Sequence, residues 1–270
     1  MQTDKARAGI QSVEVGFALL DVLARGVGPL MLRDLAAAAG MSAAKAHRYL
    51  VSFQRLGLVT QDGSSTRYDL GPAALKLGLA SLSRLDAVKL GRERVAGLVD
   101  AIGHTLALAV WGNHGPTVVH WEESPLATPV NLRLGDVMPL LSSATGRCFA
   151  AYLSKDATQD AKIAPMLQDE LARIRRLPNP AVRGDLPTNV PEVQALLAEV
   201  RRRGAARVID TLLPGVVGFC APVFDSDGHM VLGIVSLGSV ATFDGAWDGA
   251  VDRPLRAAAA RLSADLGHSA

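Results

Sequence analysis

The 270-residue chain contains little cysteine, few aromatic side chains (4%) and no long apolar run. Its two cysteines, Cys148 and Cys220, provide neither a disulfide framework nor a paired metal-ligand spacing, which favours a reducing cytoplasm. No apolar stretch approaches the ~18 residues that a membrane helix needs, and residues 1–14 lack the apolar core of a signal peptide. These absences predict a cytoplasmic protein with no membrane partner.

Charge is nearly balanced over the whole chain but not along it. The net charge is +2, yet nine Lys and Arg stand against six acidic residues up to Ala80, a net of +3. The remainder carries 19 basic and 20 acidic residues, a net of −1. A basic excess at one end is compatible with a polyanion partner but does not establish one. With 49% hydrophobic residues, the chain is long enough for two domains with separate cores.

Apolar residues near the N-terminus recur at three- and four-residue steps and predict three short helices. The second helix lies in LRDLAAAAG, and Gly40-Met41-Ser42 connects it to the third, as in a helix-turn-helix. Gly40 can follow the C-terminus of one helix and Ser42 can cap the next. The first helix is expected over residues 11–24, with its buried face formed by Val13, Phe17, Leu20 and Ala24.

The third helix, in SAAKAHRYLVSFQRL (residues 42–56), has a basic outward face. A helical projection places Ala46 and Leu50 inward, with Tyr49, Phe53 and Leu56 beside them, and Arg48 and Arg55 outward. Such a face suits a helix that enters the DNA major groove, although a solvated amphipathic helix has the same pattern. The predicted DNA contacts are Ser42, Ala44, Lys45, His47, Arg48 and Ser52, together with Arg67.

Residues 58–60 and 67–70 can pair as strands around the turn DGSS, which completes a winged helix. The tip, residues 64–67, can lie along the phosphate backbone. At this point IQSVEVGFALLDVLA and LRDLAAAAGMSAAKAHRYLVSFQRLGLVTQDGSSTRYDLG resemble the DNA-binding domain of IclR-family transcriptional regulators. The similarity continues in GDVMPLLSSATGRCFAAYLS and in VRRRGAARVIDTLLPGVVGFCAPVFDSDGHMVLGIVSLG, so that it covers nearly the whole chain in the family's order.

The resemblance implies an α+β fold with three parts. Residues 1–71 would form the winged helix-turn-helix domain, residues 72–92 a linker helix, and residues 93–270 a GAF-like mixed α/β effector-binding domain, with a mixed sheet covered by helices. In the family, the linker helps to pair two DNA-binding domains, and packing on its own chain is the alternative. The apolar stripe of the linker consists of Leu75, Leu79, Leu82 and Leu85.

The segment SSATGR opens a predicted helix whose first amides can hold an anion. In resembling effector domains these amides hold a ligand carboxylate; an ordinary helix capped by Ser142 or Ser143 is the alternative. Gly218, Val235 and Leu237 stand where the family often has a cysteine and serines, which favours an aromatic or larger acid over glyoxylate. The predicted effector-binding residues are Trp111, Met138, Ser143, Ala144, Thr145, Gly146, Asp210, Phe219, Cys220, Val235 and Leu237.

No nucleophile elbow and no phosphate-binding glycine loop occurs in the sequence, so we predict a regulator rather than an enzyme, with no cofactor and no metal. His120 and Glu122 share a strand face near His114, but spacing places no third ligand. Asp225 and Asp227 in DSDG are expected in a hairpin turn. The expected partners are double-stranded operator DNA, a small carboxylate and further copies of the chain, in a homodimer or tetramer. Two alternatives remain: a small-molecule hydrolase that uses Cys220 or Ser143, and a protein-interaction module with a degenerate winged helix.

Overall fold

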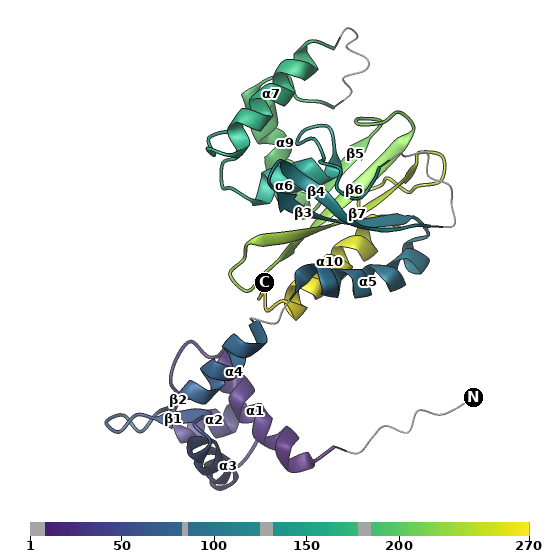
Figure 1. Cartoon of the computed structure of the whole chain (residues 1–270). Coiled ribbons are helices and arrows are strands. Elements are labelled where there is room, and N and C mark those ends of the chain that lie inside the picture. The colour runs from purple at the N-terminus through teal and green to yellow at the C-terminus, as the bar shows by residue number, and fades with distance from the viewer. Residues whose placement is uncertain (1–8, 83–85, 125–131, 178–184, 270) are drawn as a thin grey trace, which may run out of the picture. The chain divides into compact units, whose positions relative to one another are not determined.

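The structure, a computed structural model, describes residues 9–82, 86–124, 132–177 and 185–269 (Figure 1). Contacts divide the chain into two compact units, Met1–Arg84 and Leu85–Ala270. The predicted linker, residues 72–92, contains helix α4 of the first unit and the beginning of helix α5 of the second. Each unit has its own buried core.

The first unit is a winged helix-turn-helix. Its helices are α1 (Gln11–Arg25), α2 (Leu32–Ala38), α3 (Ala43–Arg55) and α4 (Pro72–Leu82), and its strands are β1 (Val59–Gln61) and β2 (Tyr68–Leu70). The two strands pair antiparallel, and Leu30 adds a bridge to Tyr68. The core joins Leu19 and Leu23 of α1 to Leu35, Ala46 and Leu50 of the following helices.

The predicted buried face of α1 is wrong. Val13 and Phe17 are 64% and 63% exposed, whereas Gly16, Leu19 and Leu23 are buried. Helix α1 is apolar on more than one side, so periodicity alone did not identify the side that packs against α2 and α3. On α3, Ala46 and Leu50 are buried as predicted, but Leu56 is 65% exposed.

The second unit is built on a five-stranded sheet in the order β4-β3-β7-β6-β5. The strands are β3 (Thr105–Gly112), β4 (Gly115–Glu122), β5 (Ala206–Ile209), β6 (Val216–Phe224) and β7 (Met230–Ser239). Every described pair is antiparallel, so the expected mixed sheet is corrected to an antiparallel one within an α+β fold. Hairpins join β3 to β4 and β6 to β7, and the latter turn contains DSDG.

Helices cover both faces of this sheet (Figure 1). On one face lie α5 (Ala87–Ile102) and α10 (Asp252–Asp265). On the other lie α6 (Ala144–Tyr152), α7 (Ile163–Arg175) and α9 (Val190–Arg203). Because side chains alternate along a strand, Val235 and Leu237 face the α6 side, whereas Ile234 and Phe219 face the α5 side.

Candidate DNA-binding surface and effector pocket

Helix α3 begins with a side-chain cap and presents its basic face to solvent. The Ser42 hydroxyl accepts a hydrogen bond from Lys45 N at 3.4 Å, and Gly40 turns the chain before it with φ +64°. Ala46 and Leu50 hold the helix against the core. Lys45, His47 and Arg48 are exposed on the side of the helix away from this core.

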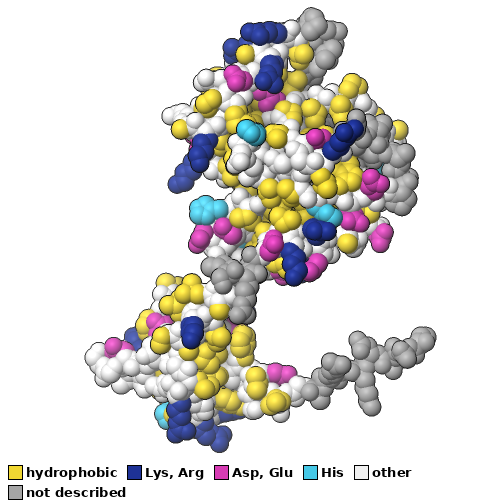
Figure 2. Space-filling model, in the orientation of Figure 1, with side chains coloured by type: hydrophobic (Ala, Val, Ile, Leu, Met, Phe, Trp, Pro, Cys, Tyr) yellow, Lys and Arg dark blue, Asp and Glu magenta, His cyan; other side chains and the backbone are white. Residues whose placement is uncertain are grey.

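The cations of α3 have no acidic partner among the described residues, unlike Arg25 and Arg33 of the preceding helices. Arg25 and Arg33 pair with Asp21 and Asp34, but no described acid pairs with Lys45, Arg48 or Arg55. Figure 2 shows Lys and Arg side chains gathered over α3. The exposed side chains on this surface are Ala44, Lys45, His47, Arg48, Ser52 and Arg55.

The wing has a mixed charge rather than a basic tip. Hydrogen bonds from the Ser64 hydroxyl and from the amides of Ser64 and Ser65 lower the pKa of Asp62, so this exposed carboxylate remains ionised at neutral pH. Arg67 is exposed, and its Nη1 donates to the carbonyl of Pro29 at 3.2 Å. One of the five guanidinium donors is thus used to hold the wing to the preceding loop.

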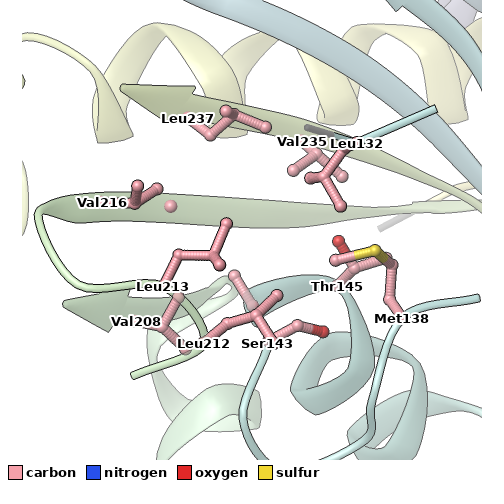
Figure 3. A pocket seen from close by; sticks show the side chains of 12 residues that line it. Leu132, Met138, Ser143, Thr145, Val208, Leu212, Leu213, Val216, Val235 and Leu237 are labelled. Atoms are coloured by element: carbon pink, nitrogen blue, oxygen red, sulfur yellow. The ribbon is translucent and has the colours of Figure 1, made fainter. Parts of the chain in front are cut away.

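An apolar cavity lies in the second unit between the N-terminus of α6 and the sheet (Figure 3). Its volume is about 40 Å³, room for about three water molecules. No charged residue is among the described residues that line it. The lining consists of Leu132, Met138, Ser143, Ala144, Thr145, Val208, Leu212, Leu213, Val216, Gly218, Val235 and Leu237.

The first turn of α6 supplies the polar groups of this cavity. The Ser143 hydroxyl caps the helix by accepting from Gly146 N at 2.8 Å, and it donates to Pro139 O at 2.7 Å. No described residue accepts a hydrogen bond from the amides of Ala144 and Thr145. These two N–H groups, at the positive end of the helix dipole, can therefore bind an anion.

Two charged side chains hold the turn before α6 from opposite sides. Buried Arg147 donates from Nε to Leu141 O at 2.6 Å, and Glu170 of α7 accepts from Leu141 N at 3.0 Å. Glu170 also accepts from the amide and hydroxyl of Ser142. Gly146 allows this turn to lie against the helix, because a Cβ there would stand 1.9 Å from Pro139 O. The amides of Ala144 and Thr145, which we call the cradle, are consequently fixed in place before any ligand binds.

The chain between β5 and β6 covers the cavity with Leu212 and Leu213. Asp210 adopts φ +55° and accepts from Gly215 N at 2.6 Å, which closes this loop. Thr211 donates to Asp185 Oδ1 at 3.2 Å, and Asp185 forms a two-pronged ion pair with Arg147 at 2.8 and 2.9 Å. Arg147 therefore connects the two sides of the cavity: it bonds directly to the turn before α6 and, through Asp185, to Thr211 of the covering loop.

Five of the residues predicted for the effector site do not line the cavity. Phe219 faces the opposite side of the sheet, where it packs on Phe243 and Trp247. Asp210 is exposed, since its carboxylate serves the loop. Gly146 uses its amide for the cap, Cys220 is buried in the core, and Trp111 lies against Phe149 beyond the cavity.

Five apolar residues that line the cavity were not predicted from the sequence, and one of them, Val208, belongs to β5. Leu132 precedes the α6 turn, and Leu212, Leu213 and Val216 come from the run TLLPGVVG between two strands. This run is apolar although it is a loop, which is a signal for a segment that covers a cavity. The roles of Arg147, Asp185 and Glu170 carried no comparable signal, because each partner is distant in the sequence.

The residues considered for metal binding or nucleophilic catalysis have other contacts. His120 pairs with Glu122 at 3.2 Å on the edge strand β4. Among the described residues, Asp225, Asp227 and His229 form the one cluster compact enough for a metal, but Asp225 already accepts from the amides of the other two. Cys220 is buried, and Ser143 uses its hydroxyl in the cap, so neither resembles an activated nucleophile.

A winged helix with a basic exposed helix face, followed in the same chain by a domain with an apolar cavity, is the architecture of a ligand-responsive DNA-binding regulator. No helix in the described part of the chain is both long and apolar enough to cross a membrane.

Comparison with known proteins agrees with this class. The model of the IclR helix-turn-helix domain matches residues 12–63, and the model of the bacterial transcriptional regulator IclR C-terminal domain matches residues 79–264. The glycerol operon regulatory protein of Streptomyces griseus is 31% identical over 264 residues, which are 96% of this chain and 97% of that protein. The chain belongs to the IclR family and is a transcriptional regulator.

Solved structures give the same result. Pseudomonas aeruginosa HmgR is 35% identical, with a TM-score of 0.83 over 96% of this chain and 99% of that one. The Agrobacterium tumefaciens repressor BlcR, at 20% identity and a TM-score of 0.77, covers 99% of this chain and 100% of that one and shares the fold. Regulators of this family bind operator DNA and small effectors, are oligomeric, and are not enzymes.

Proposed function

We propose that this regulator is controlled by a small carboxylate that binds at the N-terminus of α6 and changes the affinity of α3 for operator DNA. The coupling is a linkage: an acid that binds one arrangement of the protein more tightly must shift DNA affinity by the same factor that DNA shifts acid affinity. The protein acts in the cytoplasm, where the DNA is. The observation that carries this proposal is that the amides of Ala144 and Thr145 have no acceptor among the described residues and lie beside an apolar cavity, whose described lining includes no charged residue.

The DNA contacts are assigned to the exposed face of α3 and to the wing. Arg48 and Lys45 reach base edges or phosphates in the major groove, and Arg67 contacts the backbone. The unpaired state of the α3 cations supports this assignment, because no described acid competes with phosphate for them. The smaller residues Ser42, Ala44, His47 and Ser52 complete the same surface.

Two copies of the chain would present two recognition helices to a roughly palindromic site. Exposed apolar side chains in the first unit support pairing of this kind: Val13 and Phe17 on α1, and Leu75 and Leu79 on α4, are 56–65% exposed. The side chains of Leu82 and Leu85, which belong to the same predicted stripe, lie outside the described residues. We propose a homodimer through these surfaces, with a tetramer as its further assembly.

The effector is proposed to be an aromatic or otherwise larger organic acid. Val235, Leu237, Leu212 and Leu213 give the cavity apolar walls, and burial of apolar surface contributes about 25 cal/mol per Å². Part of this gain is offset by ordering the ligand and the pocket. A benzoate-type ring needs more room than about 40 Å³, so the cover formed by Leu212 and Leu213 must move outward when it binds.

A two- or three-carbon acid is the second candidate, and the cavity volume favours it. Such an acid requires less movement of the cover than a benzoate-type ring, but apart from Thr145 the walls offer little for the polar atoms beyond its carboxylate. Unpaired buried polar groups of this kind are costly. The apolar walls of the pocket thus favour an aromatic acid, whereas its present volume favours a two- or three-carbon acid.

Calorimetry with benzoate, phenylacetate, pyruvate and glyoxylate separates the two candidates. We expect an aromatic acid to bind at least tenfold more tightly than pyruvate or glyoxylate, and Leu237→Ser to narrow this difference. The best acid is then added to fluorescence anisotropy titrations with operator DNA selected from a random pool. Equal or tighter binding of pyruvate or glyoxylate would exclude the aromatic class, and an unchanged DNA affinity would exclude the acid as effector.

A further inference from the structure

The Thr145 hydroxyl is buried beside the cavity without a partner. Thr145 is 2% exposed, and no described residue forms a hydrogen bond with its Oγ1. In Figure 3 this oxygen points from α6 into the space below the strands. A buried hydroxyl that lacks a partner is unfavourable and is rare in folded proteins.

The neighbouring Ser143 shows that the local structure can satisfy a hydroxyl. Its Oγ both donates to Pro139 O and accepts from Gly146 N. A threonine in a helix commonly turns its hydroxyl to the carbonyl four residues earlier. For Thr145 that carbonyl is Leu141 O, which accepts a 2.6 Å bond from Arg147 Nε instead. Of the two hydroxyls that line the cavity, one is used by the fold and the other is left for a ligand.

The free hydroxyl lies beside the two free amides. In a helix the Cα–Cβ bond tilts toward the N-terminus, so the Thr145 side chain leans in the direction in which the amides of Ala144 and Thr145 point. No charged residue lines the described part of the cavity. A ligand carboxylate there can be compensated only by hydrogen-bond donors and by the helix dipole.

We propose that the Thr145 hydroxyl is the third donor of the carboxylate site and determines its selectivity for carboxylates over neutral molecules of the same shape. It donates one hydrogen bond to a carboxylate oxygen, next to the N–H groups of Ala144 and Thr145. This inference rests on the proposed function, because it assigns a side-chain role within the same effector site.

The test compares Thr145→Val with Thr145→Ser. Valine keeps the branched shape and removes the hydroxyl, whereas serine keeps the hydroxyl. Calorimetry measures benzoate and pyruvate, with benzamide and pyruvamide as their neutral counterparts. We expect Thr145→Val to weaken the acid that the wild type binds by about tenfold or more, since hydrogen bonds to charged groups are the strong ones. The amide should lose much less, and Thr145→Ser should bind the acid within about threefold of wild type.

Three other results would overturn the inference, and they are distinguishable from one another. An acid affinity unchanged in Thr145→Val removes the role of the hydroxyl while the effector site stands. Equal losses for acid and amide mark a change of cavity shape rather than a missing donor. If the wild type binds neither acid, the proposed function fails with it. Thermal unfolding of each variant confirms that it is folded before binding is measured.

Discussion

Helices α3 and α6 both begin with a serine N-cap, but α3 lies at the surface of its domain and α6 is buried. In SAAK the Ser42 hydroxyl accepts from Lys45 N at 3.4 Å, and in SATG the Ser143 hydroxyl accepts from Gly146 N at 2.8 Å. In α3 only Ala46 and Leu50 are buried, whereas every residue of α6 from Ala144 to Ala151 is buried. The cap thus defines where a helix starts, and the residues after it decide whether its polar groups meet solvent or the protein interior.

Charge follows the same division. On α3, Arg48 is exposed and without an ionic partner among the described residues, which leaves it available to phosphates or bases. On α6, Arg147 is 2% exposed and makes four hydrogen bonds to Asp185 and to the carbonyls of Leu141 and Arg207. One arginine is free for a partner, and the other is part of the fold. Five substitutions test this contrast.

The largest effect is expected from Arg147→Met. The change leaves two buried carbonyls and Asp185 without their donor, so the free energy of unfolding should fall by about 3 kcal/mol, near the low end for broken buried pairs because Asp185 is half exposed. Urea unfolding measures it. Burial alone would raise the pKa of Asp185, but hydrogen bonding and charge from Arg147, with Thr211, lower it.

The pH dependence gives a second readout for the same variant. With a lowered folded-state pKa, Asp185 contributes stability that is present above its unfolded pKa of about 3.9 and is lost as pH falls through the lower folded value. Arg147→Met should remove this acid-side loss. Arg48→Ala, on the exposed helix, is the control and should leave the stability unchanged at every pH.

Arg48→Ala should have its effect on DNA instead. If Arg48 reads a base, the change weakens operator binding by about 1–3 kcal/mol and relaxes the preference at one position. Fluorescence anisotropy with selected and random DNA measures both. An even loss on the two DNAs would identify a phosphate contact, and no loss on either would refute α3 as the recognition helix.

The two caps should differ when each serine is replaced by alanine. Loss of an N-cap costs about 0.5–2 kcal/mol, and we expect Ser143→Ala near the upper value because Gly146 N is buried. Ser42→Ala should lie near the lower value, since water can reach Lys45 N at the exposed end of α3. If the two variants lost equal free energy of unfolding in urea, burial of the helix start would not determine how much its cap stabilises the protein.

The smallest effect is expected from Arg67→Ala in the wing. It should lower the slope of log affinity against log salt by about one unit and leave the sequence preference unchanged. The bond to Pro29 O keeps one donor occupied, so the loss of affinity should be less than for Arg48→Ala. A changed consensus with an unchanged slope would place Arg67 on a base.

The sequence predicted the elements with strong local signals and failed where the answer depended on packing. Ser42, Gly40 and the spacing of Ala46 and Leu50 predicted helix α3, and its buried side was predicted except at Leu56. The buried side of α1 was predicted wrongly, because Val13 and Phe17 belong to an exposed apolar face that periodicity cannot distinguish from a buried one.

Only some of the residues that line the cavity were predicted, again because periodicity does not show which side of an apolar element faces the cavity. Met138, Ala144, Thr145, Val235 and Leu237 line it, and each came from the comparison of motifs. Phe219 was misplaced because β6 is apolar on both sides, as expected of a strand covered by helices on both faces. Helix α7 was not predicted, although Ile163, Leu167, Leu171 and Ile174 follow helical spacing.

The pairing of β3 with β7 has a consequence for synthesis of the protein. Thr105 lies opposite Leu237, so the centre of the sheet joins segments more than 120 residues apart, and such long-range pairing is slow. The core of the winged helix and the pairing of its two strands are formed by residues within 9–82. On the ribosome the winged helix can fold while β7 is still unmade, since domains generally fold as units from the N-terminus. A nascent chain would then be able to touch DNA before it could bind an effector, and a chain cut short before β7 would be a DNA-binding fragment without control.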